Sequence, residues 1–326
     1  MLLAAVMGIL CPALVFSAVR SRGPVNNDGQ ERTTVQTTAN TATVEETVQK
    51  KQEITVSVLM PDGTIQKEAL EEYIKSVVLR EMPADFEPEA LKAQAVVART
   101  YTLRRWNKGV KHTGADICTD PSCCQGYRDA SEYLRDGGSE EGLKKVEAAV
   151  MATEGQVLVY QGKLIEATYF SCSGGMTEDA AAVWGSDLPY LQAVSSPGEE
   201  KASHYTDTVS FTAEEFQKKL NTELSGKPET WIGKASYTEG GGVAVMRIGG
   251  KDYTGVQLRQ LLGLRSTALA ITAVGNTVTV TTKGFGHRVG MSQYGADAMA
   301  VTGSTYDKIL AHYYQNTTLT HWGDVD

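Results

Sequence analysis

Apolar residues recur at steps of three and four positions along the stretch that begins at Leu70. The members of this stripe are Tyr73, Ile74, Val77 and Val78. Such spacing puts the side chains on one side of a helix, so the stretch predicts an amphipathic helix packed on a core. The next position of the stripe is Glu81, and the pattern ends directly after it, at Met82 and Pro83.

Glu81 thus occupies a place that the pattern reserves for an apolar side chain, on the last turn of the predicted helix. Burial and the electronegative C-terminal end of a helix both favour the protonated form of a carboxyl group. A glutamic acid that keeps its proton near neutral pH can act as a general acid. The periodicity leaves a second interpretation open, in which Glu81 points to solvent or pairs with a lysine.

A second helix is predicted from Pro88 to Trp106, because a proline suits the first helical position and no glycine or proline interrupts the stretch. Its packing side is expected to consist of Leu91, Ala95, Ala98 and Thr102. Lys92 and Arg99 fall on another face at helical spacing. These two cations can contact a polar substrate or lower the pKa of Glu81, and they can equally belong to a solvated face.

Helix patterns occur together with strand patterns that pair as hairpins, and we expect an α+β fold with helices and antiparallel hairpins around a catalytic groove. Strands are expected at 54–58, 156–160, 163–170, 271–274 and 277–282, and helices at 139–152, from about 292 to 303 and at 304–314. Two capping boxes, Thr212 with Glu215 and Thr254 with Gln257, lie within a segment at about 207–265. We expect this segment to be an inserted α+β subdomain without chemistry of its own, within one folded domain at 53–326.

Two loops that contain glycines follow predicted strands and carry polar side chains. Ser171 and Ser173 stand beside Gly174 and Gly175, and hydroxyl groups next to glycines allow close approach to a sugar. A tight turn alone explains the same residues. No Gly-x-Ser-x-Gly motif accompanies these serines, which argues against a serine nucleophile.

The second loop, from Gly284 to Gly290, contains His287 and leads into the helix that begins near Ser292 and Gln293. A strand, a glycine loop and a helix also form dinucleotide sites. Here the glycine spacing is different, and no acidic residue follows at the distance that ribose binding requires, so such a site is excluded. A lone histidine of this kind is often structural.

Four metal-binding side chains lie within thirteen residues, in a loop broken by Gly114 and Pro121. They are His112, Cys118, Cys123 and Cys124. This set can bind zinc tetrahedrally, and the zinc would be structural because the protein fills all four positions. The alternative is a disulfide, for example of Cys118 with Cys123 or Cys124, or of one of these with Cys172. The adjacent Cys123 and Cys124 would rarely bond to each other.

The N-terminus is apolar and uncharged from Leu2 to Val19, a length that suits a membrane span or the apolar part of a signal peptide. Residues 23–52 are rich in Thr, Asn, Gln and Val without a sustained period, which predicts a flexible linker. The formal net charge of −8 and the absence of a basic run argue against nucleic acid as a partner.

Three stretches together resemble the stage II sporulation protein D family of membrane-anchored lytic transglycosylases from endospore-forming bacteria. They are LEEYIKSVVLREMPADFEPEALKAQAVVARTY from Leu70, TYFSCSGGMTED from Thr168 and GFGHRVGMSQYGADAMA from Gly284. The resemblance covers about residue 50 to the C-terminus. It implies an uncleaved anchor at 1–22 and a single-pass membrane protein whose bulk lies outside the cytoplasm.

The resemblance also implies roles for single residues. Glu81 matches the catalytic acid/base, and Lys92 and Arg99 match positions that support it. The loop with His287, Ser292 and Gln293 is expected beside the glutamate, where these side chains can orient glycan hydroxyl or acetamido groups. Some members bind a structural zinc with two His and two Cys, and Cys123 departs from that pattern if it replaces a histidine.

The activity implied is cleavage of peptidoglycan glycan strands between N-acetylmuramic acid and N-acetylglucosamine, with 1,6-anhydro products. A single acid suffices, whereas hydrolysing glycosidases need two carboxylates. The implied partners are a cell-wall amidase that strips stem peptides first and the membrane proteins of engulfment. The competing hypothesis is a non-catalytic wall-binding module that stimulates a partner amidase, because relatives of the family include amidase enhancers.

Overall fold

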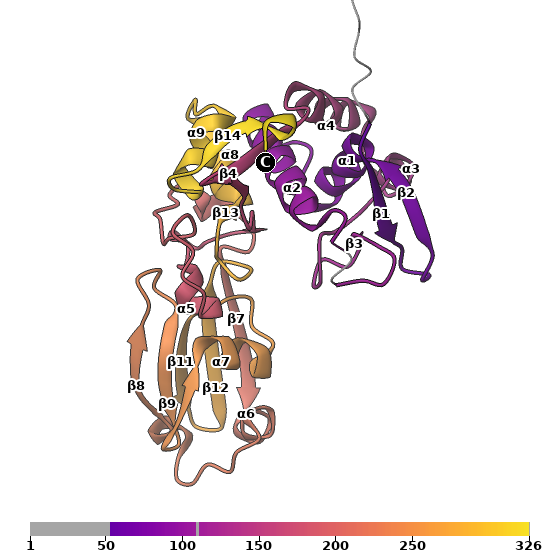
Figure 1. Cartoon of the computed structure of the whole chain (residues 1–326). Coiled ribbons are helices and arrows are strands. Elements are labelled where there is room, and N and C mark those ends of the chain that lie inside the picture. Colours follow the sequence, from indigo (N-terminus) through magenta and orange to yellow (C-terminus); the bar gives the residue numbers. More distant parts are fainter. Residues whose placement is uncertain (1–52, 109–110, 326) are drawn as a thin grey trace, which may run out of the picture. The chain divides into compact units, whose positions relative to one another are not determined.

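Five helices pack together in the larger of two hydrophobic cores. The computed structural model describes residues 53–108 and 111–325. Helices of this core are α1 (Leu70–Glu81), α2 (Pro88–Arg105), α4 (Glu140–Ala152), α8 (Gln293–Val301) and α9 (Tyr306–Tyr313). The central one is α2, which contacts the other four (Figure 1). The helices α1 and α2 confirm the two helices expected from the sequence.

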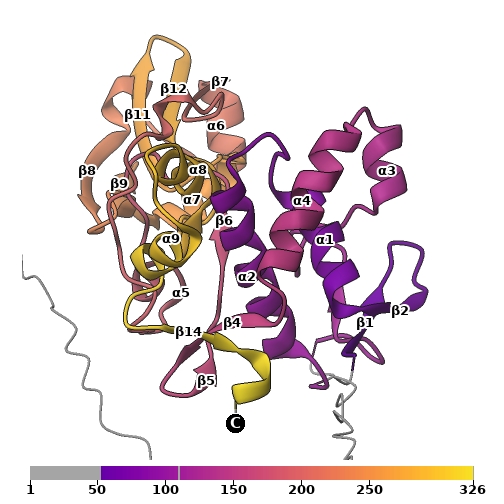
Figure 2. The ribbon, with the colours of Figure 1, turned by 90° about the horizontal axis from the view of Figure 1, so that it is seen from above.

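The helix α2 is buried on nearly every side, because α1 and α4 cover it together with the C-terminal helices (Figure 2). Its predicted packing residues Leu91, Ala95 and Ala98 are completely buried. Small alanine side chains allow the neighbouring helices to approach closely. The face that carries Arg99 is buried as well, so the expectation of a solvated or substrate-facing side at this residue is wrong.

Small sheets surround this helical core. Strands β1 (Thr55–Leu59), β2 (Ile65–Ala69) and β3 (Ile117–Cys118) form one sheet, in which β1 is antiparallel to β2 and parallel to β3. A second sheet has the order β14-β4-β5, with β4 (Gln156–Tyr160), β5 (Lys163–Leu164) and β14 (Thr318–His321). The predicted second strand at 163–170 is therefore split into β5 and β6 (Tyr169–Phe170).

Strand β6 pairs in parallel with β13 (Met291–Ser292). Tyr169 lies opposite Met291 and Phe170 opposite Ser292 in this pair. The two glycine-containing loops of the sequence extend from these strands, and Cys172 forms an additional bridge with Phe285. The short pair therefore brings together the two loops that the sequence places more than a hundred residues apart.

A second hydrophobic core forms within the segment between β7 and β12. Its elements are β7 (Thr206–Thr212), α6 (Ala213–Leu220), β8 (Ile232–Tyr237), β9 (Val243–Ile248), β10 (Lys251–Thr254), α7 (Gly255–Leu262), β11 (Ala268–Val274) and β12 (Thr277–Lys283). They build two antiparallel sheets, β10-β9-β8 and β11-β12-β7. Both predicted capping boxes are present, at Thr212 and at Thr254.

This second core is larger than the expected insertion. Its buried residues extend from Phe211 to Val280 and include side chains of β11 and β12. The hairpin that was expected to follow the subdomain is therefore part of its core. The short helices α3 (Ala130–Arg135) and α5 (Ala180–Trp184) complete the α-helices of the described segments. The mixture of helices and small sheets confirms the α+β class.

No helix within 53–108 or 111–325 is both long and apolar enough to cross a membrane. We therefore withdraw the expectation of a single-pass membrane protein. The stretches on which it rested, the apolar segment within 1–22 and the linker at 23–52, lie outside the residues that the structure describes.

Candidate active site

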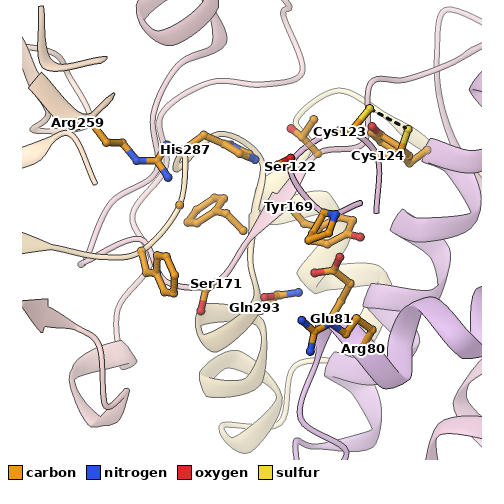
Figure 3. Close-up of a pocket in the computed structure, with 16 residues that line it drawn as sticks. Arg80, Glu81, Ser122, Cys123, Cys124, Tyr169, Ser171, Arg259, His287 and Gln293 are labelled. Carbon is orange, nitrogen blue, oxygen red and sulfur yellow. Dashed lines mark hydrogen bonds between the residues drawn. The ribbon is translucent and has the colours of Figure 1, made fainter. Parts of the chain in front are cut away.

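A cavity of about 620 Å³ opens where the end of α1 faces β6 and the loop before β13 (Figure 3). Glu81, Tyr169, Ser171, His287 and Gln293 line it. Four of these five residues were predicted from the sequence as catalytic or substrate-binding. The structure thus brings together a carboxyl group from the first signature stretch and polar groups from both glycine-containing loops.

Glu81 is the last residue of α1, and its side chain is half-buried against the cysteine-bearing loop. The backbone N–H of Gly126 donates a hydrogen bond to carboxylate oxygen Oε1. Burial raises the pKa of Glu81, and this effect exceeds the opposing effects of the Gly126 N–H, the positive charge of Arg80 and the Tyr169 hydroxyl. The direction agrees with the expectation from the apolar stripe, and burial is the largest cause.

Gly126 approaches Glu81 so closely that no side chain fits between them. A Cβ atom at this position would lie 2.8 Å from Glu81 Oε1 and 2.6 Å from Arg80 Cγ. The same loop is joined to α1 by a second backbone hydrogen bond, from the Arg128 N–H to the Ser76 carbonyl, at 3.0 Å. Gly126 was not among the predicted site residues, because nothing local in the sequence distinguishes it from a turn glycine.

Tyr169 lies within the second stretch that resembles the family and has no role predicted from the sequence. Its hydroxyl group lies beside Glu81 and donates a hydrogen bond to Gln125 Oε1 at 3.2 Å. Gln125 in turn donates from Nε2 to Thr102 Oγ1 on α2, at 3.0 Å. Burial raises the pKa of Tyr169 well above its ordinary value, so the hydroxyl keeps its proton and remains a donor.

Ser171 follows β6, and its Oγ lies 2.6 Å from Nε2 of His204, a residue that the sequence analysis did not single out. His204 stacks edge-on against Phe285 and Tyr294. Burial lowers the pKa of His204, with a smaller contribution from the charge of Arg265. The hydrogen bond to a neutral imidazole fixes the position of the Ser171 hydroxyl at the wall of the cavity.

His287 packs between aromatic rings, with Phe170 at 5.6 Å and Trp184 at 5.3 Å between ring centroids. Its Nδ1 accepts a hydrogen bond of 3.1 Å from the Val289 N–H. Burial, together with the charge of Arg259, lowers the pKa of His287 to about 4. The imidazole is therefore neutral at physiological pH and serves as a hydrogen-bonding wall residue rather than a cation.

Two predicted substrate-binding cations lie away from the cavity. Arg99 is completely buried, and its guanidinium binds Glu71 through two hydrogen bonds of 2.8 and 2.5 Å. Lys92 pairs with Glu89 at 2.6 Å, next to the ring of Tyr306. The neighbouring cation that lowers the pKa of Glu81 is instead Arg80.

Ser173 and Ser292 are also buried inside the protein instead of facing the cavity. The Ser173 hydroxyl donates to Glu199 Oε2 at 2.8 Å, and this carboxylate also accepts from the Ser173 and Gly174 N–H groups. The Ser292 hydroxyl caps α8 by accepting from the Gly295 N–H at 3.3 Å. Both serines stabilise the loops that position the site, so their prediction as substrate contacts is wrong.

Four candidate metal ligands converge beside the same cavity. The ligand atoms of His112, Cys118, Cys123 and Cys124 all lie within 4.8 Å of one another. His112 Nε2 is 3.3 Å from Cys124 Sγ and 3.7 Å from Cys123 Sγ, and the two sulfurs are 4.0 Å apart. Two thiolates bound tetrahedrally to zinc lie about 3.8 Å apart, which follows from a zinc–sulfur bond of about 2.3 Å.

The donor set therefore fits a tetrahedral zinc ion. The four described cysteines are free, whereas a disulfide requires sulfurs about 2.0 Å apart. Cys123 and Cys124 also line the cavity, and the chain runs from them through Gln125 to Gly126. A metal in this cluster would hold the loop whose N–H contacts Glu81.

Comparison with known proteins shows the family of the chain. A family described as stage II sporulation protein matches residues 62–160, the segment that contains α1, α2 and the cysteine loop. The stage II sporulation protein D of Bacillus subtilis (strain 168) is 44% identical over 79% of this chain and 76% of its own length. The protein of the same name from Bacillus amyloliquefaciens is 39% identical over 97% of this chain and 93% of its own length.

A protein named amidase enhancer, also from Bacillus subtilis (strain 168), is 30% identical over 76% of this chain and 40% of its own length. The identity to the two stage II sporulation proteins D extends over most of both chains. The chain therefore belongs to the stage II sporulation protein D family.

Proposed function

We propose that this member of a sporulation protein family is a peptidoglycan lytic transglycosylase in which Glu81 is the single acid/base. The observation that carries the proposal is that Glu81 is the only acidic residue among the described residues that line the cavity. Burial holds the pKa of this carboxyl group above its ordinary value, which favours the protonated form that a general acid needs.

The proposed reaction begins when Glu81 donates its proton to the glycosidic oxygen between N-acetylmuramic acid and N-acetylglucosamine. The bond from that oxygen to the muramic acid C1 breaks through an oxocarbenium-like state. The C6 hydroxyl oxygen of the same sugar then bonds to C1, and its proton passes to the Glu81 carboxylate. The product ends in a 1,6-anhydro ring, no water is consumed, and Glu81 is protonated again.

The neighbours of Glu81 suit both halves of this cycle. While the sugar binds, the half-buried environment favours the neutral acid. Once the proton has left, the Gly126 N–H and the Arg80 guanidinium stabilise the carboxylate. Ser171 and Gln293 line the same cavity, and their proposed role is to orient sugar hydroxyl and acetamido groups.

A hydrolysing glycosidase fits the cavity less well. Retaining enzymes hold two carboxyl groups about 5 Å apart and inverting enzymes about 6.5–9.5 Å apart. No second carboxyl group occurs among the described residues that line this cavity. A proton acceptor other than a second acid is therefore required, and in the proposed reaction Glu81 itself takes that role.

We also propose that the cluster of His112, Cys118, Cys123 and Cys124 binds a structural zinc ion. The close approach of the four ligand atoms supports it. Because the protein would fill all four positions, the metal would supply no open site for a water molecule. Its proposed role is to hold the loop that ends at Gly126 against α1.

The proposed setting is engulfment during endospore formation, in association with a cell-wall amidase. The relative named amidase enhancer supports a connection to an amidase. The same relative favours the second candidate function, a non-catalytic module that binds peptidoglycan and stimulates the amidase. In that case the cavity would bind glycan without cleaving it.

The two functions are separated by the masses of the products. Purified full-length protein is incubated with glycan strands from which an amidase has removed the stem peptides, and the soluble sugars are analysed by mass spectrometry. A transglycosylase leaves 1,6-anhydro ends with no added mass, and a hydrolase adds one water per cleavage. Strands that are bound and remain uncut would overturn the proposed enzymatic function in favour of the binding module.

A further inference from the structure

Arg259 extends from α7 of the second core to the wall of the cavity that contains Glu81 (Figure 3). The sequence analysis assigned no chemistry to this segment. The side chain is half-buried, and burial alone lowers the pKa of Arg259. Among the described residues, no carboxylate forms an ion pair with it. A half-buried cation that lacks a counter-ion is free to bind a ligand that supplies the negative charge.

The other arginines of this region have acidic partners. Arg247 pairs with Asp252 and Arg265 pairs with Asp207, each at 3.1 Å. The buried Arg288 pairs with Glu178, also at 3.1 Å. Arg259 therefore differs from its neighbours in being directed into a cavity instead of toward an acid.

The charge of the cavity is opposite to that of the chain. The sequence carries a formal net charge of −8. The charged residues among the described lining are Arg80, Arg259 and Glu81, which gives a net charge of about +1 with Glu81 ionised and +2 with Glu81 protonated. A cavity with positive charge attracts an anionic ligand, even though the protein as a whole is acidic.

The shape beside Arg259 indicates what carries the anion. Arg259 also lines an adjoining cavity of about 410 Å³, together with Val183, Trp184, Val256 and Leu264. The Trp184 side chain is 41% exposed, so its ring is available to a ligand. A guanidinium beside apolar walls suits a carboxylate on a short, partly apolar arm. His287 lies next to it as a neutral imidazole.

We propose that Arg259 is a specificity-determining residue that binds the free lactyl carboxylate of N-acetylmuramic acid from which the stem peptide has been removed. The inference rests on the proposed function, because it names the form of glycan that the same cavity accepts. The lactyl ether carries one methyl group and one carboxyl group. In intact peptidoglycan this carboxyl group is a neutral amide bonded to the peptide, whereas amidase action leaves a carboxylate that a guanidinium can bind with two hydrogen bonds.

Binding is measured with the full-length chain carrying Glu81→Gln, so that no strand is cut. Three oligosaccharides of equal length are compared: muramic acid glycan with free lactyl carboxylates, the same glycan converted to neutral methylamides, and an N-acetylglucosamine oligomer without lactyl groups. We expect the free acid to bind roughly ten- to hundredfold more tightly than the methylamide, as for other charge-assisted hydrogen bonds. Equal affinity for the acid and the methylamide would overturn the inference, and this comparison requires no substitution of Arg259.

Adding Arg259→Gln is expected to remove this preference by weakening binding of the acid to the level of the methylamide. Arg259→Lys should keep part of the preference for the free acid, because lysine retains the positive charge but cannot form the two parallel hydrogen bonds of a guanidinium. Arg247→Gln is the matched control, since this arginine belongs to the same core and lies outside the cavity. Equal weakening of both ligands by Arg259→Gln would contradict a role in reading the carboxylate.

The outcome is separable from that of the proposed function. If the wild-type chain releases no anhydro ends and the Arg259-dependent preference for the acid is observed, the enzymatic proposal fails and the carboxylate site stands. If anhydro ends are released equally fast from the free acid and the methylamide, and Arg259→Gln changes neither rate, the enzymatic proposal stands and the inference about Arg259 is refuted.

Discussion

The backbone N–H of Gly126 donates a hydrogen bond to the carboxylate of Glu81, although 45 positions separate the two residues in the sequence. Glu81 ends α1, and Gly126 directly follows the cysteine loop and Gln125. The contact fixes the direction of the carboxyl group while burial disfavours its charge. Both conditions are needed for a side chain that must donate a proton and later take one back.

Gly126→Ala is expected to lower kcat/KM on peptide-free glycan at least about tenfold, because misplacing a catalytic group by a fraction of an ångström to 1 Å is costly. The new Cβ would lie 2.8 Å from Glu81 Oε1 and would push the carboxyl group away from its position. The measurement is steady-state kinetics, with circular dichroism to show that the variant is folded. Gly323→Ala is the control, because this exposed glycine has no positive φ and a Cβ there would meet only the His321 side chain, at 3.3 Å. Wild-type kinetics in Gly126→Ala would contradict the geometry described here.

The pH dependence of activity should report the acid form of Glu81. Because the proposed reaction needs this residue protonated, kcat/KM is expected to fall as pH rises through a pKa above the ordinary 4.5 of glutamate. Arg80 favours the carboxylate, so Arg80→Gln should move this alkaline limb to higher pH. A limb that stays in place or moves to lower pH in that variant would show that another group controls the profile.

Glu81→Gln should stabilise the fold at neutral pH. The folded-state pKa of Glu81 is raised, so the wild-type protein is favoured while the group is protonated and loses that contribution as pH rises through the folded pKa. Glutamine is neutral at every pH and avoids the loss. In urea unfolding at pH 8, the variant should therefore have a higher free energy of unfolding than wild type. This difference should shrink when the pH falls below the ordinary pKa of glutamate. If the stability of the variant relative to wild type were lower at pH 8 than at low pH, the carboxylate of Glu81 would not be destabilised by burial.

Metal analysis of the full-length protein should find one zinc ion per chain. Cys123→Ala is expected to lose the metal and lower the Tm, whereas Cys123→His should retain it because imidazole is also a zinc ligand. Elemental analysis with a thiol count provides the measurement. A chain without metal, in which two of the cluster cysteines resist thiol reagents until reduced, would show that the disulfide alternative is correct.

The sequence predicted the positions and starts of helices where the signal lies in neighbouring residues. The stripe from Tyr73 to Val78 located α1 and the half-buried carboxyl group at its end, and the Thr212 and Thr254 capping boxes located the starts of α6 and α7. Each depends on side chains within one or two helical turns of one another. Such signals depend little on the fold of the rest of the chain.

The patterns failed where distant elements decide the outcome. Arg99 was expected on an accessible face, but α2 is covered on nearly every side, and Glu71 on α1 neutralises the buried guanidinium. Tyr169 and Arg259 reach the cavity from β6 and α7, elements that share no local signal with α1. Their places follow from the β6–β13 pairing and from the packing of the second core, which a single sequence does not reveal.

The most direct measurement of the central proposal is the rate at which full-length protein releases 1,6-anhydro ends from peptide-free glycan, compared between wild type, Glu81→Gln and Glu72→Gln. Glu72 lies on the same helix, is largely exposed and serves as the matched control. We predict anhydro ends from wild type and from Glu72→Gln at similar rates, and none above background from folded Glu81→Gln. Release at the wild-type rate from Glu81→Gln would contradict the assignment of Glu81 as the acid/base.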